Sequence, residues 1–189
     1  RMRGMTLDLF RQDAYLRECS ATVTAIGEQG IMLDRTVFYP EGGGQVGDAG
    51  AAMFGDLNLF VVDTYRAGDQ IAHLARVADG GTQELMDALE QKPAGRLHVY
   101  RERRFATMRN HTATHLLHHA LRHVLGDHVK QAGSMVGPDR LRFDFSHYDA
   151  VTDEQILEIE RLANAETLAN SPTRNFETTK DEAEALGAV

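Results

Sequence analysis

The stretch that decides the organisation of this chain is RNHTATHLLHHAL, residues 109–121. Apolar side chains recur in it and just after it at helical spacing, at positions 113, 116, 117, 120, 121 and 124. This pattern predicts an amphipathic helix, and Gly126 is a natural stop for it. When residues are placed about 100° apart around the helix axis, one narrow strip lies nearly opposite the apolar stripe. It contains His111, His115, His118 and Arg122. We therefore expect these histidines to face solvent or a cleft.

His111 and His115 are one helical turn apart, so their imidazoles lie on one face of the helix. Zn²⁺ accepts nitrogen ligands of this kind, but two ligands do not complete a site. A polar helix face that is rich in histidine is the alternative interpretation. The motif also lacks the glutamate that serves as general base in HExxH metalloproteases, which disfavours a protease.

Composition and charge limit the classes of protein that remain. The chain has 189 residues, of which 42% are hydrophobic, and no apolar run reaches the length of a membrane span, so we expect no membrane partner. The only cysteine, Cys19, excludes an internal disulfide and favours a cytoplasmic location. The formal net charge of −8 argues against bulk, non-specific binding of nucleic acid.

A local basic stretch leads directly into the histidine helix, and within it only Glu102 is acidic. Its arginines are Arg96, Arg101, Arg103, Arg104 and Arg109. Residues 96–103 are expected to form a strand. A basic strip on an otherwise acidic protein suits a phosphate backbone that is delivered to one place. A solvated strand face is the alternative.

The first half of the chain predicts a small β-barrel or sandwich, because short strands alternate with glycine-containing turns. Residues 21–26 and 31–33 are expected to form a hairpin, and residues 57–63 and 71–77 to form further strands. Residues 82–90 are expected as a short helix or loop. The pattern changes near Pro93, so we expect one domain over residues 1–93 and a second over residues 94–189.

The second half predicts an α+β layer with helices on one face of a sheet. Residues 141–145 alternate between apolar and polar and predict a half-buried strand, after a loop at residues 133–134. Capping boxes that begin at Thr152 and Thr179 predict two further helices. Residues 173–178 are expected to form a strand between them.

A glycine-rich stretch, TVFYPEGGGQVGD, occupies residues 36–48. Three consecutive glycines allow positive φ angles and the close approach of another segment. The stretch is not a P-loop, because neither Lys-Ser/Thr nor a helical pattern follows it.

Three stretches, in order, resemble the editing region of alanyl-tRNA synthetases: TVFYPEGGGQVGD (36–48), NHTATHLL (110–117) and LRFDFSH (141–147). The first two also resemble free-standing editing relatives. The resemblance covers nearly the whole chain and implies a small glycine-rich β-barrel followed by a two-layer α/β editing core. It also implies hydrolysis of the ester in tRNA(Ala) that is mischarged with serine or glycine. A synthetic pocket for alanine cannot reject either amino acid strongly, so a second, hydrolytic site is needed.

The resemblance implies roles for particular residues. In the family, HxxxH and a later CxxxH hold zinc, and a bound water attacks the aminoacyl carbonyl. His111 and His115 match the first pair. Gln45 matches the family's glutamine after the glycines, and Thr36 matches a threonine that recognises the serine hydroxyl, so both are expected to serve hydrolysis.

The resemblance is also incomplete, because no CxxxH segment is present in the 189 residues. We therefore expect an incomplete zinc site, and a chain that folds but does not edit. Arg101, Arg104 and Arg109 are expected to contact tRNA.

Several assignments stay open on the sequence. Residues 133–136 followed by RFDFSH favour a synthetase as parent, with the rest of the synthetase as a partner in cis. The alternatives are a free-standing trans-editing deacylase, a module that binds the tRNA acceptor stem without catalysis, and an unrelated metal-dependent hydrolase that uses His118 or His147 as further ligands.

Overall fold

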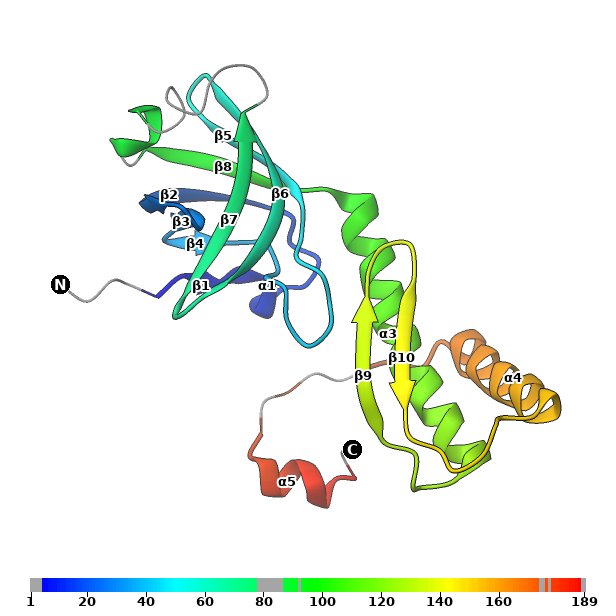
Figure 1. The fold of residues 1–189 in the computed structure, drawn as a ribbon. Helices are drawn as coiled ribbons and strands as arrows, with labels where there is room; N and C mark the ends of the chain where they lie inside the picture. Colours follow the sequence, from blue (N-terminus) through cyan, green and yellow to red (C-terminus); the bar gives the residue numbers. More distant parts are fainter. Residues whose placement is uncertain (1–4, 78–86, 92, 174–175, 177, 188–189) are drawn as a thin grey trace.

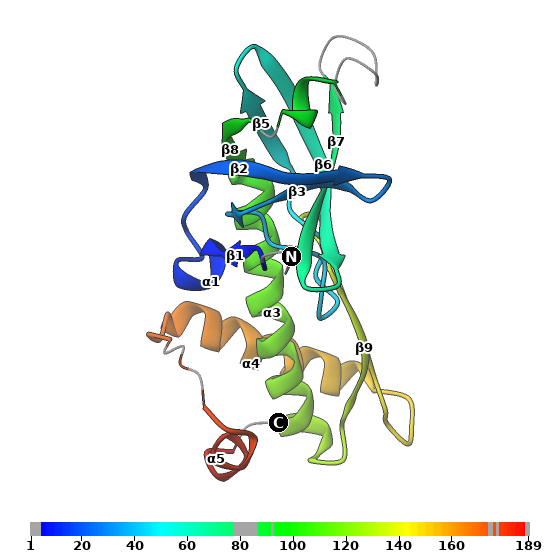
Figure 2. The ribbon, with the colours of Figure 1, turned by 90° about the vertical axis from the view of Figure 1, so that its left-hand side faces the viewer.

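A closed six-stranded β-barrel forms the first part of the molecule in the computed structural model, which describes residues 5–77, 87–91, 93–173, 176 and 178–187 (Figures 1 and 2). The strands follow one another around the barrel in this order: β2 (Glu18–Gly27), β3 (Gly30–Leu33), β7 (Gln70–Val77), β6 (Leu57–Ala67), β5 (Gly50–Phe54) and β8 (Ala94–Val99). The predicted barrel is confirmed.

Local sequence accounts for most of these strands. The predicted hairpin is present as β2 and β3, and it turns through Gly30, whose φ is +115°. Strand β5 was not predicted, because its sequence GAAMF has only small or unbranched side chains before Phe54. Strand β8 pairs with both β2 and β5, so the barrel continues past the boundary expected near residue 93 and includes residues 94–99.

Apolar side chains from every barrel strand fill its interior, with Val23, Leu33, Leu59 and Leu97 at 2% exposure or less. Three short elements lie beside the barrel. Strand β1 (Leu7–Asp8) pairs in parallel with β4 (Arg35–Thr36), and helix α1 (Leu9–Gln12) follows β1.

The histidine stretch lies in a long helix, α3 (Arg101–Leu125), which leaves the barrel directly after β8 (Figure 1). The predicted helix is confirmed, and it ends at Gly126, whose φ is +114°. Its beginning differs from the prediction. The expected strand over residues 96–103 ends at Val99, and Arg101 already belongs to the helix. The arginines after Val99 are therefore spread around a helix instead of alternating along a strand.

An antiparallel hairpin of β9 (Gln131–Val136) and β10 (Leu141–Phe145) packs against α3. Strand β10 is the predicted half-buried strand. The loop expected at residues 133–134 is wrong, because Gly133 and Ser134 pair with Asp144 and Phe143 inside the hairpin.

Helix α4 (Asp153–Ala169) packs on another side of α3 (Figure 2), and α5 (Lys180–Ala185) follows it. Both predicted capping boxes are present, at Thr152 with Gln155 and at Thr179 with Glu182. Of the strand expected over residues 173–178, residues 173, 176 and 178 are not in a strand, and the rest lie outside the described residues. Residues 87–90 are helical, whereas residues 82–86 of the same prediction lie outside the description.

A second apolar cluster joins α3, α4 and the hairpin. Its fully buried members are Ala120, Leu121, Val129 and Ile159, and Phe143 and Phe145 of β10 pack against them. The predicted α+β arrangement is thus confirmed. Within the described residues, none of the helices is both long enough and apolar enough to cross a bilayer.

Candidate active site

The glycine-rich stretch forms a loop that extends from the barrel and lies on the β9–β10 hairpin. Gly43 and Gly44 have φ angles of +59° and +82°, which glycine adopts without strain. The Gly44 carbonyl accepts a hydrogen bond from Val136 N at 2.8 Å, and Val46 N donates to Val136 O at 3.0 Å. A side chain at Gly44 would meet the Ser134 carbonyl oxygen at 2.5 Å. The loop therefore depends on glycine at this position for its contact with β9.

Gln45 is the residue through which this loop reaches the histidine helix. Its side chain is buried, and its Oε1 lies 2.7 Å from Nδ1 of His111, 66 residues further along the chain. An amide oxygen only accepts hydrogen bonds, so His111 donates from Nδ1 and its Nε2 keeps a free lone pair. Burial, followed by the charge of His115, lowers the pKa of His111 below its usual range. His111 is thus held neutral, with Nε2 available as a ligand.

The neighbouring His115 ring lies 5.1 Å from that of His111, measured between ring centroids. The two rings line one small cavity of about 80 Å³. Residues from three parts of the molecule line this cavity, namely the glycine loop, α3 and the hairpin. They are Gly43, His111, Thr114, His115, His118, Gln131, Ser134, Val136 and Phe143. The histidine face predicted from the helical pattern therefore does face a cleft.

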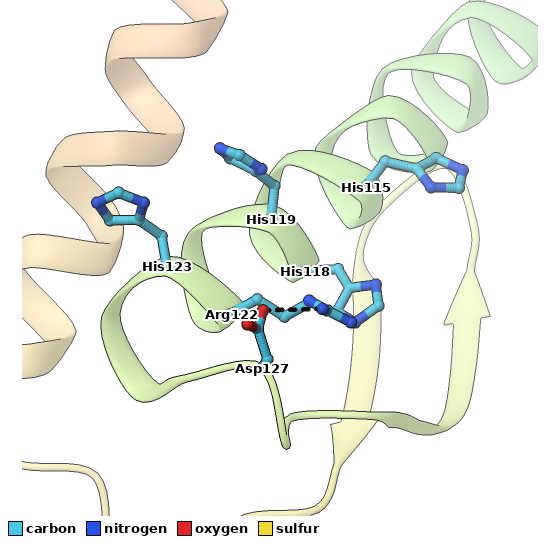
Figure 3. A pocket seen from close by; sticks show the side chains of 6 residues that line it. All are labelled: His115, His118, His119, Arg122, His123 and Asp127. Carbon is cyan, nitrogen blue, oxygen red and sulfur yellow. Dashed lines mark hydrogen bonds and ion pairs between the residues drawn. The ribbon is translucent and has the colours of Figure 1, made fainter. Parts of the chain in front are cut away.

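A larger cavity of about 390 Å³ continues from the first along the last turns of α3 (Figure 3). The two cavities share His115 and His118. The remaining lining residues of the larger one are His119, Arg122, His123 and Asp127. The His118 ring lies 5.1 Å from the Phe143 ring between centroids and is tilted against it by 39°. Its buried Nε2 has no hydrogen-bond partner among the residues that the structure describes.

Thr36, expected to recognise a substrate hydroxyl, lies in the barrel core instead. It is fully buried, its Oγ1 lies 2.8 Å from Nε2 of His73, and it accepts a hydrogen bond from Phe38 N. It is not among the residues that line the small cavity. His73 is itself buried, and this burial lowers its pKa to about 4. The Thr36 hydroxyl is therefore bonded to groups inside the barrel, and this geometry does not fit the expected catalytic role.

Arg104, expected to contact tRNA, is also buried. The N–H of its Nε is shared between the two oxygens of the Asp48 carboxylate, at 3.1 and 2.9 Å, and an Nη donates to the same carboxylate at 2.6 Å. It also donates to the carbonyl oxygens of Ala14 and Val37. Arg and Asp side chains are each 4% exposed. The expectation for Arg104 does not fit this geometry, because its donors are already bonded within the protein.

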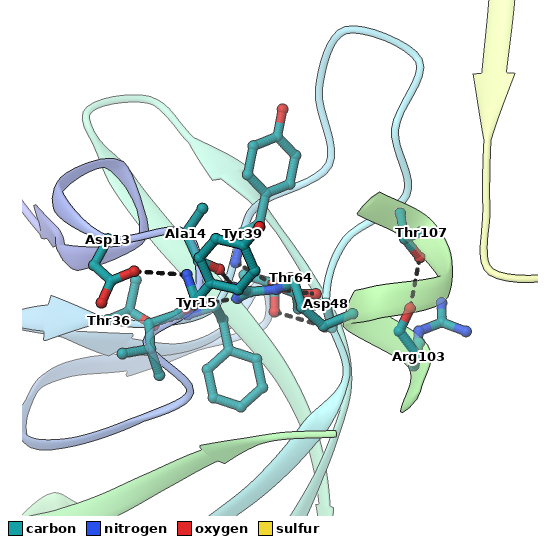
Figure 4. A network of polar contacts seen from close by, with 12 residues as sticks. Asp13, Ala14, Tyr15, Thr36, Tyr39, Asp48, Thr64, Arg103 and Thr107 are labelled. Carbon is teal, nitrogen blue, oxygen red and sulfur yellow. Dashed lines mark hydrogen bonds and ion pairs between the residues drawn. The ribbon is translucent and has the colours of Figure 1, made fainter. Parts of the chain in front are cut away.

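The same ion pair lies at the base of the glycine loop, where Asp48 is close to Tyr39 (Figure 4). Asp48 accepts a hydrogen bond from Tyr39 N at 2.7 Å, and its own N donates to Tyr39 O at 2.9 Å, which closes the loop between these residues. Arg104 precedes His111 by two helical turns and lies on the same face of α3. The loop is thus bonded to α3 at its base through Asp48 and at its tip through Gln45.

The other arginines of the basic stretch have different surroundings. Arg96 on β8 pairs with exposed Glu18 at 3.6 Å. The Arg101 guanidinium lies over the Phe105 ring, 5.4 Å from its centroid, and Arg109 is exposed elsewhere on α3. That Arg101 and Arg109 contact tRNA stays a prediction.

Sequence reasoning missed two partners that support the site, Asp48 and strand β9, and it also missed His73 in the barrel core. Asp48 offered a signal, because an acidic residue at the end of an apolar, glycine-rich stretch needs a cationic partner if it is buried. His147, considered as a metal ligand, lies with its Nδ1 2.9 Å from His128 Nε2. No group of three or more potential metal-binding side chains is found within the described part of the chain.

A family model described as class II tRNA synthetases (A) matches residues 6–90, which hold most of the barrel and the glycine loop. The alanine–tRNA ligase of Alkaliphilus oremlandii is 42% identical over 188 residues, or 99% of this chain, and the ligase of Halorhodospira halophila is 47% identical over 166 residues. This chain is related to the alanyl-tRNA synthetases.

A further relative, the alanine–tRNA ligase of Ignicoccus hospitalis, is 42% identical over 181 residues, or 95% of this chain. The chain spans about a fifth of the length of these ligases, at 18–20% of each. The similarity runs through both parts of the fold, so the histidine helix is included as well as the barrel.

Proposed function

We propose that this chain is the editing region of an alanyl-tRNA synthetase, within which it takes part in hydrolysing the aminoacyl ester of tRNA(Ala) that carries serine or glycine. The relatives support the synthetase part of this proposal. The observation that carries the editing part is the Gln45–His111 hydrogen bond of 2.7 Å. It joins two sequence motifs of the editing resemblance at one small cavity, although they are far apart in the chain.

The residues present fit a zinc ion at this cavity. Nε2 of His111 has a free lone pair because Nδ1 is bonded to Gln45, and this second bond is the usual way in which a metal-binding histidine is oriented. His115 would supply the next ligand from the following helical turn. When bound, zinc lowers the pKa of a coordinated water toward neutrality and makes it a nucleophile. Ligands beyond this pair would come from other segments of the ligase.

The chain's own residues orient and enclose the aminoacyl group. Gln45 holds the His111 ring in one tautomer, and the loop and hairpin line the cavity beside the two rings. A cavity of about 80 Å³ has the volume of a few water molecules at about 30 Å³ each, so it suits small side chains. Serine and glycine are the small amino acids that a binding site for alanine cannot reject by binding alone.

The partners under this proposal are tRNA(Ala) and the remaining segments of the ligase in cis, in the cytoplasm where proteins are made. A second candidate function is a tRNA-binding module without hydrolysis. The observation in its favour is that no group of three or more potential metal ligands is found among the described residues.

Deacylation of Ser-tRNA(Ala) tests the proposal. We expect a full-length ligase that carries this segment to release serine faster than alanine from tRNA(Ala). Gln45→Leu in the same ligase should slow serine release while aminoacylation with alanine is retained. Serine release at the wild-type rate in Gln45→Leu would remove Gln45 from the site, and stoichiometric zinc without any deacylation would favour the binding module.

A further inference from the structure

The larger cavity has no role in the proposed hydrolysis. It holds about 390 Å³ and adjoins the smaller one through the shared residues His115 and His118. Figure 3 shows His115 and His118 on the side of the hairpin, His123 on the side of α4, and Arg122 between them. A ligand that enters the small cavity from this side therefore passes along the last turns of α3.

The chemistry of this cavity favours an anion. Its lining side chains carry N–H donors, with the single exception of Asp127. Asp127 is 93% exposed and accepts a hydrogen bond from Arg122 at 2.9 Å, whereas the Arg122 side chain is 27% exposed. An ion pair with one partner this exposed contributes little to stability. An incoming anion can therefore replace Asp127 at little cost and take both donors of a guanidinium edge.

We propose that this cavity is a groove for the phosphodiester backbone of RNA, with Arg122 as its central contact. The inference rests on the proposed function, because an aminoacyl ester in the small cavity must stay connected to the nucleotide strand that carries it. Arginine suits this ligand, since its planar fork binds two phosphate oxygens at once. Arg104 cannot compete for this role, because its donors are bonded to Asp48 and to backbone carbonyls.

Binding of uncharged tRNA(Ala) to the 189-residue chain tests the groove apart from hydrolysis. Affinity is measured at several salt concentrations for the wild type, Arg122→Gln and Asp127→Asn. Arg142→Gln is the matched control, because Arg142 forms a similar exposed pair with Asp144 at 2.6 Å but does not line the cavity. Arg101→Gln represents the basic stretch at the start of α3. Circular dichroism confirms that each variant is folded.

We expect Arg122→Gln to weaken binding about tenfold and to reduce the slope of log affinity against log salt by about one. Asp127→Asn should strengthen binding about threefold, because a competing carboxylate is lost. Arg142→Gln should leave both quantities unchanged. The proposal would be overturned if Arg122→Gln and Arg142→Gln showed equal affinities and slopes. It would also be overturned if the slope changed only in Arg101→Gln.

Two further arms separate the possible failures. Inorganic phosphate is titrated against the wild type, and phosphate binding at Arg122 without any tRNA binding would overturn the assignment to RNA. Serine release from Ser-tRNA(Ala) by the full-length ligase is measured alongside. If serine is not released but the Arg122 effects on tRNA binding are present, the proposed function fails and the groove stands. If serine is released but the Arg122 effects are missing, the groove fails alone.

Discussion

The barrel and the region around α3 are stabilised in different ways. The barrel closes on itself through backbone ladders and buries a large apolar cluster. The α3 region has a smaller cluster, and its helix α4 leaves Leu157 and Leu168 at 65% and 84% exposure. Its candidate site exists only because a barrel loop reaches across to it. The barrel therefore serves as the scaffold, and the residues of the candidate site come together where the loop meets α3.

The strongest connection between the two regions is the buried pair of Asp48 and Arg104. We expect Asp48→Ala to destabilise the chain by about 3–5 kcal/mol, because it leaves a buried guanidinium without its carboxylate. Urea denaturation measures this change. Asp144→Ala, which removes the partner of exposed Arg142, is the control and should leave the midpoint unchanged. Equal midpoints for both variants would mean that the two regions do not depend on this pair.

The barrel should also respond to acid through His73. Burial lowers the pKa of His73 to about 4, against 6.5 in an unfolded chain. The unfolded chain therefore binds the proton first as the pH falls. The stability contributed by neutral His73 is complete above about pH 6.5 and is lost between there and pH 4, up to about 3 kcal/mol. In His73→Leu the protein is less stable throughout, but this part of the pH dependence should be missing. An identical pH dependence in both proteins would contradict the assignment.

The contact of the loop with the hairpin can be tested with two neighbouring glycines. Gly43→Ala should cost about 1–2 kcal/mol, since its positive φ is strained for alanine but the space around it is open. Gly44→Ala should cost about 1 kcal/mol more, because its Cβ would lie 2.5 Å from the Ser134 carbonyl oxygen. Thermal unfolding of the two variants gives the difference. Gly44→Ala should also slow serine release in the ligase, and equal effects of the two variants would argue against the docked loop.

The sequence predicted the features that arise from local patterns. The helical period gave α3 and its histidine face, and the caps at Thr152 and Thr179 gave two helix starts. The features that it missed depend on contacts between distant segments. Nothing local distinguishes a buried Arg104 from an exposed Arg101, because burial comes from Asp48 at the other end of an ion pair 56 residues away. The burial of Thr36 was missed for the same reason, since its partner His73 lies 37 residues away on β7.

Strand β9 shows a second reason. Gly133 and Ser134 favour a turn by local propensity, yet pairing with β10 and the approach of the glycine loop place them in a strand. The small residues are what allow the loop to come so close. Small residues that are typical of a loop thus lie in a strand that packs closely against the glycine loop.

The most direct test of the central claim, that the barrel loop sets the state of the histidine helix, is the tautomer of His111. Nitrogen-15 NMR of the imidazole rings, recorded without metal at neutral pH, distinguishes a proton on Nδ1 from a proton on Nε2. We predict that His111 is protonated on Nδ1 in the wild type, because Gln45 Oε1 accepts that hydrogen bond at 2.7 Å. In Gln45→Leu this preference should disappear, while His119, which does not contact the loop, should be unchanged. A wild-type His111 protonated on Nε2, or the same tautomer in both proteins, would contradict the account.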